Sequence, residues 1–265
     1  MFTLIRSMVC RCIACNERID RASDSSTFPL CSLCHSTLLL CPKLCSNCGS
    51  PECVQKAEIG HDLNKTCLRP WVQHKDIQSF SSLYLLLNTG FSVLRKWKTS
   101  RGPYFDRQVL KPNTGLIQVL RSNNAQAIIP IPQSFHRKWK MRGSPAECIA
   151  QWVSSLTHVP LVPALLPPQP PKGGERSNQE KPKRQAELSM LERLQSPLRF
   201  RINPKIEVRS IRCVILVDDF MTSGRTLDQA AQVLTRAGIE EIHVFCLGVR
   251  IAMKQKEATT RPNYP

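Results

Sequence analysis

The sequence predicts an α/β fold with a mainly parallel sheet, preceded by an N-terminal cysteine-rich zinc module. Cys213 to Val217 is a short, wholly apolar run, as expected for a parallel strand buried on both faces. Leu227 to Ala237 then places apolar residues at helical spacing. Ten of the thirteen cysteines lie before residue 68. We therefore divide the 265 residues into a zinc-binding module at 1–75 and an α/β domain at 76–265.

Two C-x-x-C pairs define the first metal site. Cys12 and Cys15 are separated from Cys31 and Cys34 by fifteen residues. Each tight turn presents two thiolates, and two such turns complete the tetrahedron of a Cys₄ zinc site. Metal is favoured over disulfides because the N-terminus lacks the apolar core of a secretory signal peptide. We therefore expect Zn²⁺ in a cytoplasmic protein.

A third C-x-x-C pair indicates a second, less complete site. Cys45 and Cys48 form the pair, and Cys67 follows as a further ligand. Either Cys41 or Cys53 would supply the fourth thiolate. The sequence therefore leaves open whether the module holds one zinc ion or two.

The basic stretch from Ser82 to Trp97 has leucines at spacings near three and four, which predicts a helix. We interpret it as a core-facing helix whose basic C-terminus is solvated, with a DNA-binding face as the alternative. Its most apolar part, Leu83 to Leu94, is interrupted by polar residues and is shorter than the roughly 20 residues that a membrane span needs. We expect no membrane insertion.

Ala127 to Pro132 predicts a second buried strand, and a helix is expected near Glu147 to Leu156. The loop between them is basic and contains Arg137 and Arg142. A basic loop at the carboxyl end of a parallel strand is suited to a pyrophosphate. The alternative is a solvated basic loop without a ligand.

The segment from residue 160 to 183 contains seven prolines and predicts a flexible loop. A short helix is expected at Arg184 to Leu194, a further strand at Ile242 to Val249, and a basic tail at Arg250 to Pro265. The whole chain carries a net charge of +17, and lysine and arginine outnumber the acidic residues most strongly between 127 and 210. This charge favours a polyanionic partner or phosphate-rich ligands.

Asp218 and Asp219 end the apolar strand, and a loop rich in hydroxyl groups leads from Thr222 into the helix. The first N–H groups of a helix lack intrahelical partners and bind phosphate. Carboxylates repel phosphate, so the acidic pair should bind hydrogen-bond donors such as a ribose diol, with or without Mg²⁺. The stretch predicts a site for a phosphorylated sugar.

The order D-D-x-x-T-S-G-x-T resembles the phosphoribosyl-pyrophosphate (PRPP) loop of type I phosphoribosyltransferases. The resemblance implies that Asp218 and Asp219 bind the ribose hydroxyls of PRPP, with Mg²⁺. It implies that the 5′-phosphate binds to the loop, whose residues are Thr222, Ser223, Gly224, Arg225 and Thr226. Arg137 and Arg142 would reach the pyrophosphate.

The order of cysteine pairs, P-x-P strand end, basic loop and PRPP loop is similar to that of the ComF family of phosphoribosyltransferase-like proteins. Members are associated with natural competence and DNA uptake. The resemblance implies competence proteins and single-stranded DNA as partners.

Two positions depart from the related patterns. The family's basic loop usually continues R-G-F-N, whereas this chain has Ser144 and Pro145 after Arg142 and Gly143. Hypoxanthine-type purine enzymes carry an aspartate as general base where this chain has Thr222, and a threonine has no pKa suited to that role. Two functions remain: a PRPP-binding protein of DNA uptake, or a transferase that moves phosphoribose to an acceptor the sequence does not name.

Overall fold

The computed structural model describes residues 10–12, 15–19, 31, 33–34, 39–40, 44–45, 76–86, 95, 114–133, 144–168, 200–222 and 224–250. The strands are β1 (Cys10–Arg11), β2 (Arg18–Ile19), β3 (Leu39–Leu40), β4 (Ser79–Leu86), β5 (Ala127–Pro130), β6 (Leu165–Leu166), β7 (Arg201–Ile202), β8 (Cys213–Met221) and β9 (Glu241–Arg250). The helices are α5 (Thr114–Ser122), α7 (Pro145–Thr157) and α9 (Arg225–Arg236).

A five-stranded sheet forms the centre of the molecule, with strand order β3-β4-β9-β8-β5. β4, β9, β8 and β5 pair in parallel, and only β3 is antiparallel to its neighbour. The predicted α/β class with a mainly parallel sheet is therefore confirmed.

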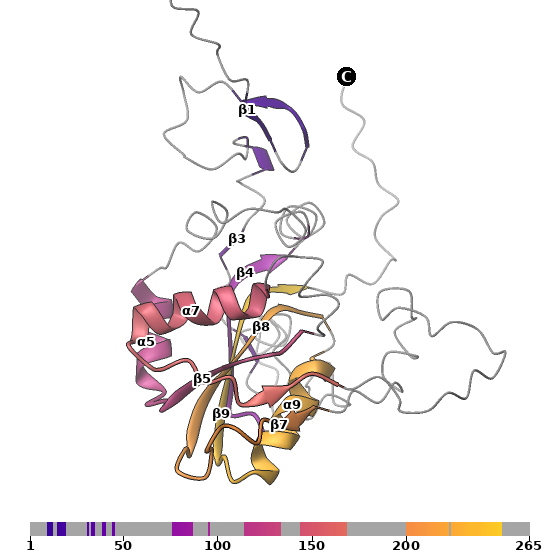
Figure 1. Ribbon diagram of the computed structural model, residues 1–265. Helices are drawn as coiled ribbons and strands as arrows, with labels where there is room; N and C mark the ends of the chain where they lie inside the picture. The colour runs from indigo at the N-terminus through magenta and orange to yellow at the C-terminus, as the bar shows by residue number, and fades with distance from the viewer. Residues whose placement is uncertain are drawn as a thin grey trace, which may run out of the picture.

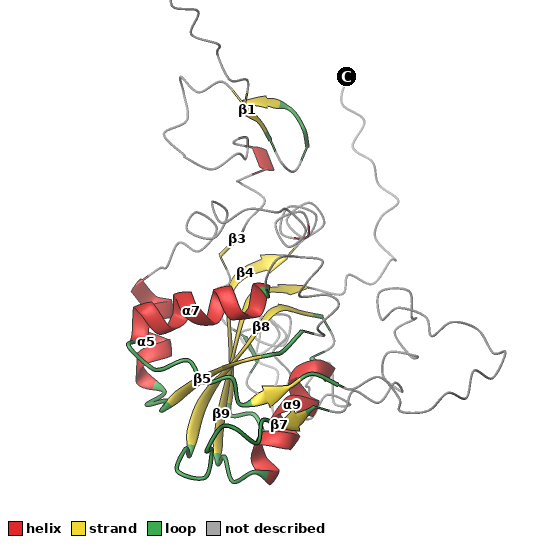
Figure 2. Cartoon of the chain, in the orientation of Figure 1, coloured by secondary structure: helices red, strands yellow, loops and turns green. Residues whose placement is uncertain are grey.

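Helices cover both faces of this sheet (Figures 1 and 2). On one face, α5 and α7 pack through Leu120 and Ile149 against a cluster that includes Ile215 of β8. On the other face, α9 packs through Leu234 against a cluster that includes Val214. Adjacent residues of β8 thus enter opposite cores, since successive strand side chains point to opposite faces. This explains why the strand has no polar face.

The prediction of a helix from Ser82 to Trp97 is wrong for its first part, because Ser79–Leu86 forms β4. β4 lies between β3 and β9 and is buried along most of its length. A strand covered on both faces does not alternate apolar and polar residues, so its leucine spacing can imitate that of a helix. Apart from Arg95, the rest of the predicted helix lies outside the described residues.

The strand at Cys213 was predicted to end at the acidic pair, but β8 continues to Met221. The extension is supported by β9, which is ten residues long and pairs with β8 as far as Met221 and Val249. Asp218 and Asp219 are therefore held within the sheet ladder.

The helix expected near Glu147 is α7, and local chemistry defines both of its ends. Ser144 caps the N-terminus by accepting a hydrogen bond from the Glu147 N–H at 3.3 Å, and Pro145 occupies the first turn. His158 ends the helix in the left-handed region, with φ of 63°. The Ser-Pro pair that replaces the family's usual residues therefore starts α7.

The expected flexible loop at 160–183 begins with an ordered segment. Leu161 bridges Ile128 of β5, and β6 pairs with β7 in an antiparallel sheet. Residues 169–199 lie outside the described residues, as do the helix predicted at Arg184 to Leu194 and the tail beyond Arg250. Among the helices that the structure describes, none is both long and apolar enough to cross a membrane.

Candidate functional site

The acidic pair lies near the carboxyl end of β8, where Asp218 is level with Cys246 of β9. Asp219 is buried, with 6% of its surface exposed, whereas Asp218 is half-buried. The Asp219 N–H donates to Asp218 Oδ1 at 2.8 Å, and the Phe220 N–H donates to Asp219 Oδ1 at 2.7 Å. Each carboxylate is thus oriented by the peptide group that follows it.

The charges of this acidic pair act on the buried thiol of Cys246. Burial raises the pKa of the Cys246 thiol well above its ordinary value, and the charges of Asp218 and Asp219 raise it further. Two carboxylates close to the same buried group produce a negative potential in surroundings of low polarity. The region suits a cation or a ligand that presents hydroxyl donors.

A turn connects this strand to α9. Met221 is buried, Thr222 is exposed, and Gly224 adopts the left-handed conformation with φ of 74°. Glycine adopts this region without steric cost, and it has no side chain to cap the helix. The first helical hydrogen bond runs from the Asp228 N–H to the Gly224 carbonyl at 2.9 Å. The N-terminus of α9 is therefore a place where main-chain N–H groups can receive an anion.

The sheet fixes where this helix begins. Leu227, Ala230, Ala231 and Leu234 are buried against one face of the sheet. Because α9 follows β8 after three residues, its positive end lies at the carboxyl edge, beside the acidic pair. The strand, turn and helix expected from the sequence are therefore present together.

The neighbouring strand β5 leads to the same edge. Pro130 of β5 is level with Val217, and the Ile131 N–H donates to the Val217 carbonyl at 2.8 Å. The loop after β5 thus starts next to the acidic pair, although Arg137 and Arg142 lie outside the described residues. Gln133 follows with its Oε1 buried and without a hydrogen-bond partner among the described residues. Gln133 has no motif that marks it in the sequence, where its one signal is its place directly after the P-I-P strand end.

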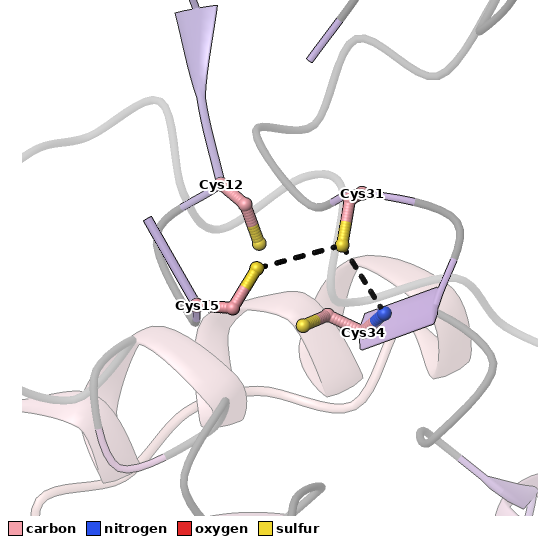
Figure 3. A group of neighbouring side chains, drawn as sticks. All are labelled: Cys12, Cys15, Cys31 and Cys34. Atoms are coloured by element: carbon pink, nitrogen blue, oxygen red, sulfur yellow. Dashed lines mark hydrogen bonds between the residues drawn. The ribbon is translucent and has the colours of Figure 1, made fainter. Parts of the chain in front are cut away.

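The first two cysteine pairs converge in the N-terminal module, as Figure 3 shows. β1 and β2 form a short hairpin, and the turn between them carries Cys12 and Cys15. The Sγ atoms of the four cysteines, which include Cys31 and Cys34, all lie within 4.8 Å of one another. The predicted convergence of Cys12, Cys15, Cys31 and Cys34 is confirmed.

Their spacing suits a tetrahedral metal ion. Cys15 Sγ and Cys31 Sγ lie 3.7 Å apart. Metal–sulfur bonds of about 2.3 Å place two tetrahedral ligands about 3.8 Å apart. The Cys34 N–H points to Cys31 Sγ at 3.4 Å, a contact that stabilises a thiolate. Burial raises the pKa of the Cys34 thiol, and hydrogen bonds to the other thiols raise it further. A cation at the centre would remove this cost, so the four cysteines could hold a metal ion.

The second predicted metal site is only partly described. Cys45 is buried, whereas Cys48 and Cys67 lie outside the described residues. Ser223 of the loop after β8 also lies outside them.

The sequence is similar to a family of known proteins and, over most of its length, to one curated protein. A family model described as "Phosphoribosyl transferase domain" matches residues 174–262, which contain β8, α9 and β9. The chain is also 22% identical over 252 residues to "Competence protein F" of Haemophilus influenzae, covering 89% of this chain and 96% of that protein. The chain therefore resembles this competence protein over most of its length and phosphoribosyltransferases over its C-terminal part.

Several solved structures are also similar, among them a purine phosphoribosyltransferase from Pyrococcus horikoshii, with 18% sequence identity and a TM-score of 0.31. The similarity covers 51% of this chain and 69% of the archaeal chain.

Proposed function

We propose that this ComF-like protein binds PRPP with Mg²⁺ and acts in DNA uptake during natural transformation. The observation that carries the PRPP proposal is the placement of Asp218 and Asp219 on β8 directly before Gly224 and the start of α9. The carboxylates would accept hydrogen bonds from the ribose hydroxyls. The N–H groups and hydroxyls from Thr222 to Thr226 would bind the 5′-phosphate.

Two metals belong to this proposal. Mg²⁺ would neutralise the pyrophosphate of PRPP, with Arg137 and Arg142 adding charge from the loop after β5. Zn²⁺ is the ion we assign to Cys12, Cys15, Cys31 and Cys34, since four thiolates in a tetrahedron favour it over magnesium or calcium. The zinc site would be structural, because four protein ligands leave no open position.

The role in DNA uptake rests on the similarity to a competence protein and on charge. A net charge of +17 favours binding to a polyanion, and we propose single-stranded DNA in the cytoplasm as that partner, together with other competence proteins. The zinc module and the basic middle of the chain would supply the contacts to phosphate.

The alternative is an active phosphoribosyltransferase of nucleotide metabolism, which would transfer phosphoribose from PRPP to an acceptor and release pyrophosphate. The matched phosphoribosyltransferase domain favours it. Thr222 would not serve as general base to the acceptor, because its hydroxyl does not ionise in the neutral range. This alternative expects pyrophosphate release from PRPP in the presence of an acceptor, lost in Asp219→Asn.

Both functions require that the protein binds PRPP, and calorimetry with PRPP and Mg²⁺ tests this requirement. We expect saturable binding by the wild type and at least about tenfold weaker binding by Asp219→Asn, because hydrogen bonds to a charged group contribute about 1.5–3 kcal/mol. Glu240→Gln removes an exposed carboxylate just before β9 and should bind as the wild type does. No PRPP binding by the wild type would contradict both functions.

A salt titration tests the DNA proposal separately. We expect single-stranded DNA to bind at low salt, with log K falling by about 0.7 per phosphate contact for each unit of log salt. An oligomer of the same bases on a neutral backbone is the control and should bind weakly at every salt concentration. Absence of DNA binding at low salt would exclude direct DNA contact while leaving PRPP binding intact.

A further inference from the structure

Three side chains with metal-ligating atoms meet at the amino ends of β8 and β9, far along the strands from the acidic pair. They are Cys213, Glu241 and His243, and their ligand atoms all lie within 4.8 Å of one another. Cys213 is level with Glu241 in the parallel register, and His243 comes two residues after Glu241. Residues at these positions share one face of a sheet, so the cluster follows from the strand register.

His243 is oriented as a metal-binding histidine. Its Nδ1 lies 2.8 Å from Ser79 Oγ of β4, the residue level with it in the register. A proton on Nδ1 donated to Ser79 leaves the lone pair on Nε2. That atom is buried and has no hydrogen-bond partner among the described residues, and Glu241 Oε2 is 3.9 Å away. Metal-binding histidines are typically held by such a bond from the other ring nitrogen.

The backbone beneath the cluster is held on both strands. Gln126 Oε1 accepts hydrogen bonds from the N–H groups of Arg212 and Cys213 at 2.6 and 3.2 Å. On β9, Gln78 Oε1 accepts from the Ile242 N–H at 2.6 Å. The Cα positions of the three candidate ligands are thus set before any ion binds, which lowers the entropic cost of binding.

The side chains differ in exposure. Cys213 is buried and His243 is largely buried, whereas 60% of the Glu241 side chain is exposed. A tetrahedral ion needs ligand atoms about 3.3–3.8 Å apart, and His243 Nε2 and Glu241 Oε2 are already 3.9 Å apart, so only a small adjustment of the exposed Glu241 side chain is needed between these two. Its exposure also provides an entry path for an ion.

We propose that Cys213, Glu241 and His243 form a further binding site for a divalent transition-metal ion of the zinc type. A thiolate, an imidazole and a carboxylate are ligands that zinc accepts together, whereas magnesium and calcium prefer oxygen alone. Three protein ligands leave the fourth position to water. The site is separate from the N-terminal cysteines and from the PRPP loop, so it does not depend on the function proposed above.

Binding of the ion would deprotonate the Cys213 thiol and would link strands β8, β9 and β4. The Cys213 thiol donates to the Asn123 carbonyl at 3.1 Å, and this proton passes to solvent when the thiolate binds the ion. The ion then joins β8 to β9, while Ser79 adds β4 through His243. We therefore expect the ion to stabilise the amino-terminal edge of the sheet.

Metal stoichiometry in the full-length protein tests the proposal. Protein depleted of metal is titrated with Co²⁺ and then Zn²⁺, and bound metal is measured by mass spectrometry after gel filtration. Glu241→Gln and His243→Gln should bind one metal ion fewer than the wild type, or should bind the ion of this site at least about 100-fold more weakly. Cys148→Ser, which removes a half-buried thiol on α7 that is not part of the cluster, should keep the wild-type stoichiometry.

A variant that changes only the orientation of His243 distinguishes a loss of metal binding from a loss of folding. Ser79→Ala keeps all three ligands and removes the partner of His243 Nδ1. It should therefore lower the affinity for the metal ion at this site about 10- to 100-fold. Glu241 is exposed, so Glu241→Gln should fold normally by circular dichroism. Equal metal content and affinity in the wild type, Glu241→Gln and His243→Gln would overturn the proposal.

Discussion

Gly248 of β9 lies directly against the Leu86 side chain of β4. A Cβ added at Gly248 would come within 2.6 Å of Leu86 Cδ1 and 2.8 Å of Leu86 Cγ. Leu86 is 1% exposed, so it has little room to move away. The contact fixes how closely β4 approaches β9 near the end of the sheet that carries the acidic pair.

We expect Gly248→Ala to lower the free energy of unfolding by about 1–3 kcal/mol, because the added methyl overpacks this contact. Chemical denaturation followed by circular dichroism measures the change. Combining Gly248→Ala with Leu86→Ala should cost less than the sum of the two single changes, since the smaller side chain makes space for the methyl. Strict additivity would contradict the proposed contact.

Removing metal should expose the thiols of the N-terminal cysteine cluster. We expect a strong chelator to release zinc and to make the thiols of Cys12, Cys15, Cys31 and Cys34 reactive towards a thiol reagent, because the thiolates lose their ion. Cys12→Ser should bind one zinc ion fewer than the wild type. Cys148→Ser is the matched control and should retain all of the bound zinc. Identical zinc content in the two variants would show that Cys12 is not a ligand.

The N-cap of α7 gives a prediction about stability. Ser144→Ala removes the oxygen that accepts from the Glu147 N–H, so we expect a loss of about 1 kcal/mol. Ser155→Ala on the same helix is the control. The Ser155 hydroxyl is exposed and donates to the Trp152 carbonyl at 2.7 Å, so its loss should change stability by a few tenths of a kcal/mol at most. Thermal unfolding distinguishes the two variants.

Tyr84 predicts how stability changes at high pH. Burial raises the pKa of the Tyr84 hydroxyl from 10 to about 12. The folded chain therefore keeps its proton where the unfolded chain loses it, and stability falls as pH rises from 10 to 12. We expect this to contribute about 3 kcal/mol, measured as the difference between wild type and Tyr84→Phe at pH 9 and pH 12. A constant difference across this range would show that Tyr84 is not effectively buried.

Local signals in the sequence were sufficient for much of the site. The apolar run before Asp218, the glycine at 224 and the helical spacing after it each reflect a requirement of a single segment. The two C-x-x-C pairs likewise indicated a cluster whose sulfurs do converge. These predictions succeeded because burial, positive φ and tight turns restrict the residues allowed at each position.

Predictions failed where an element is determined by a neighbouring strand that is distant in the sequence. β4 was mistaken for a helix because its burial between β3 and β9 removed the alternation that marks a strand. The length of β8 was underestimated because its last residues are held by β9, which comes later in the chain. Cys213, Glu241 and His243 were not selected together, because only the parallel register brings them side by side.

The sequence alone determined the α/β class, the first cysteine cluster and the order of acidic pair, turn and helix, since each depends on neighbouring residues. The tertiary structure decided which strands pair, how far β8 extends past Asp219, and that residues of β8 and β9 meet at the opposite edge of the sheet. The physical reason is that ladder hydrogen bonds and burial on both faces come from strands remote in sequence. No local pattern encodes these contacts.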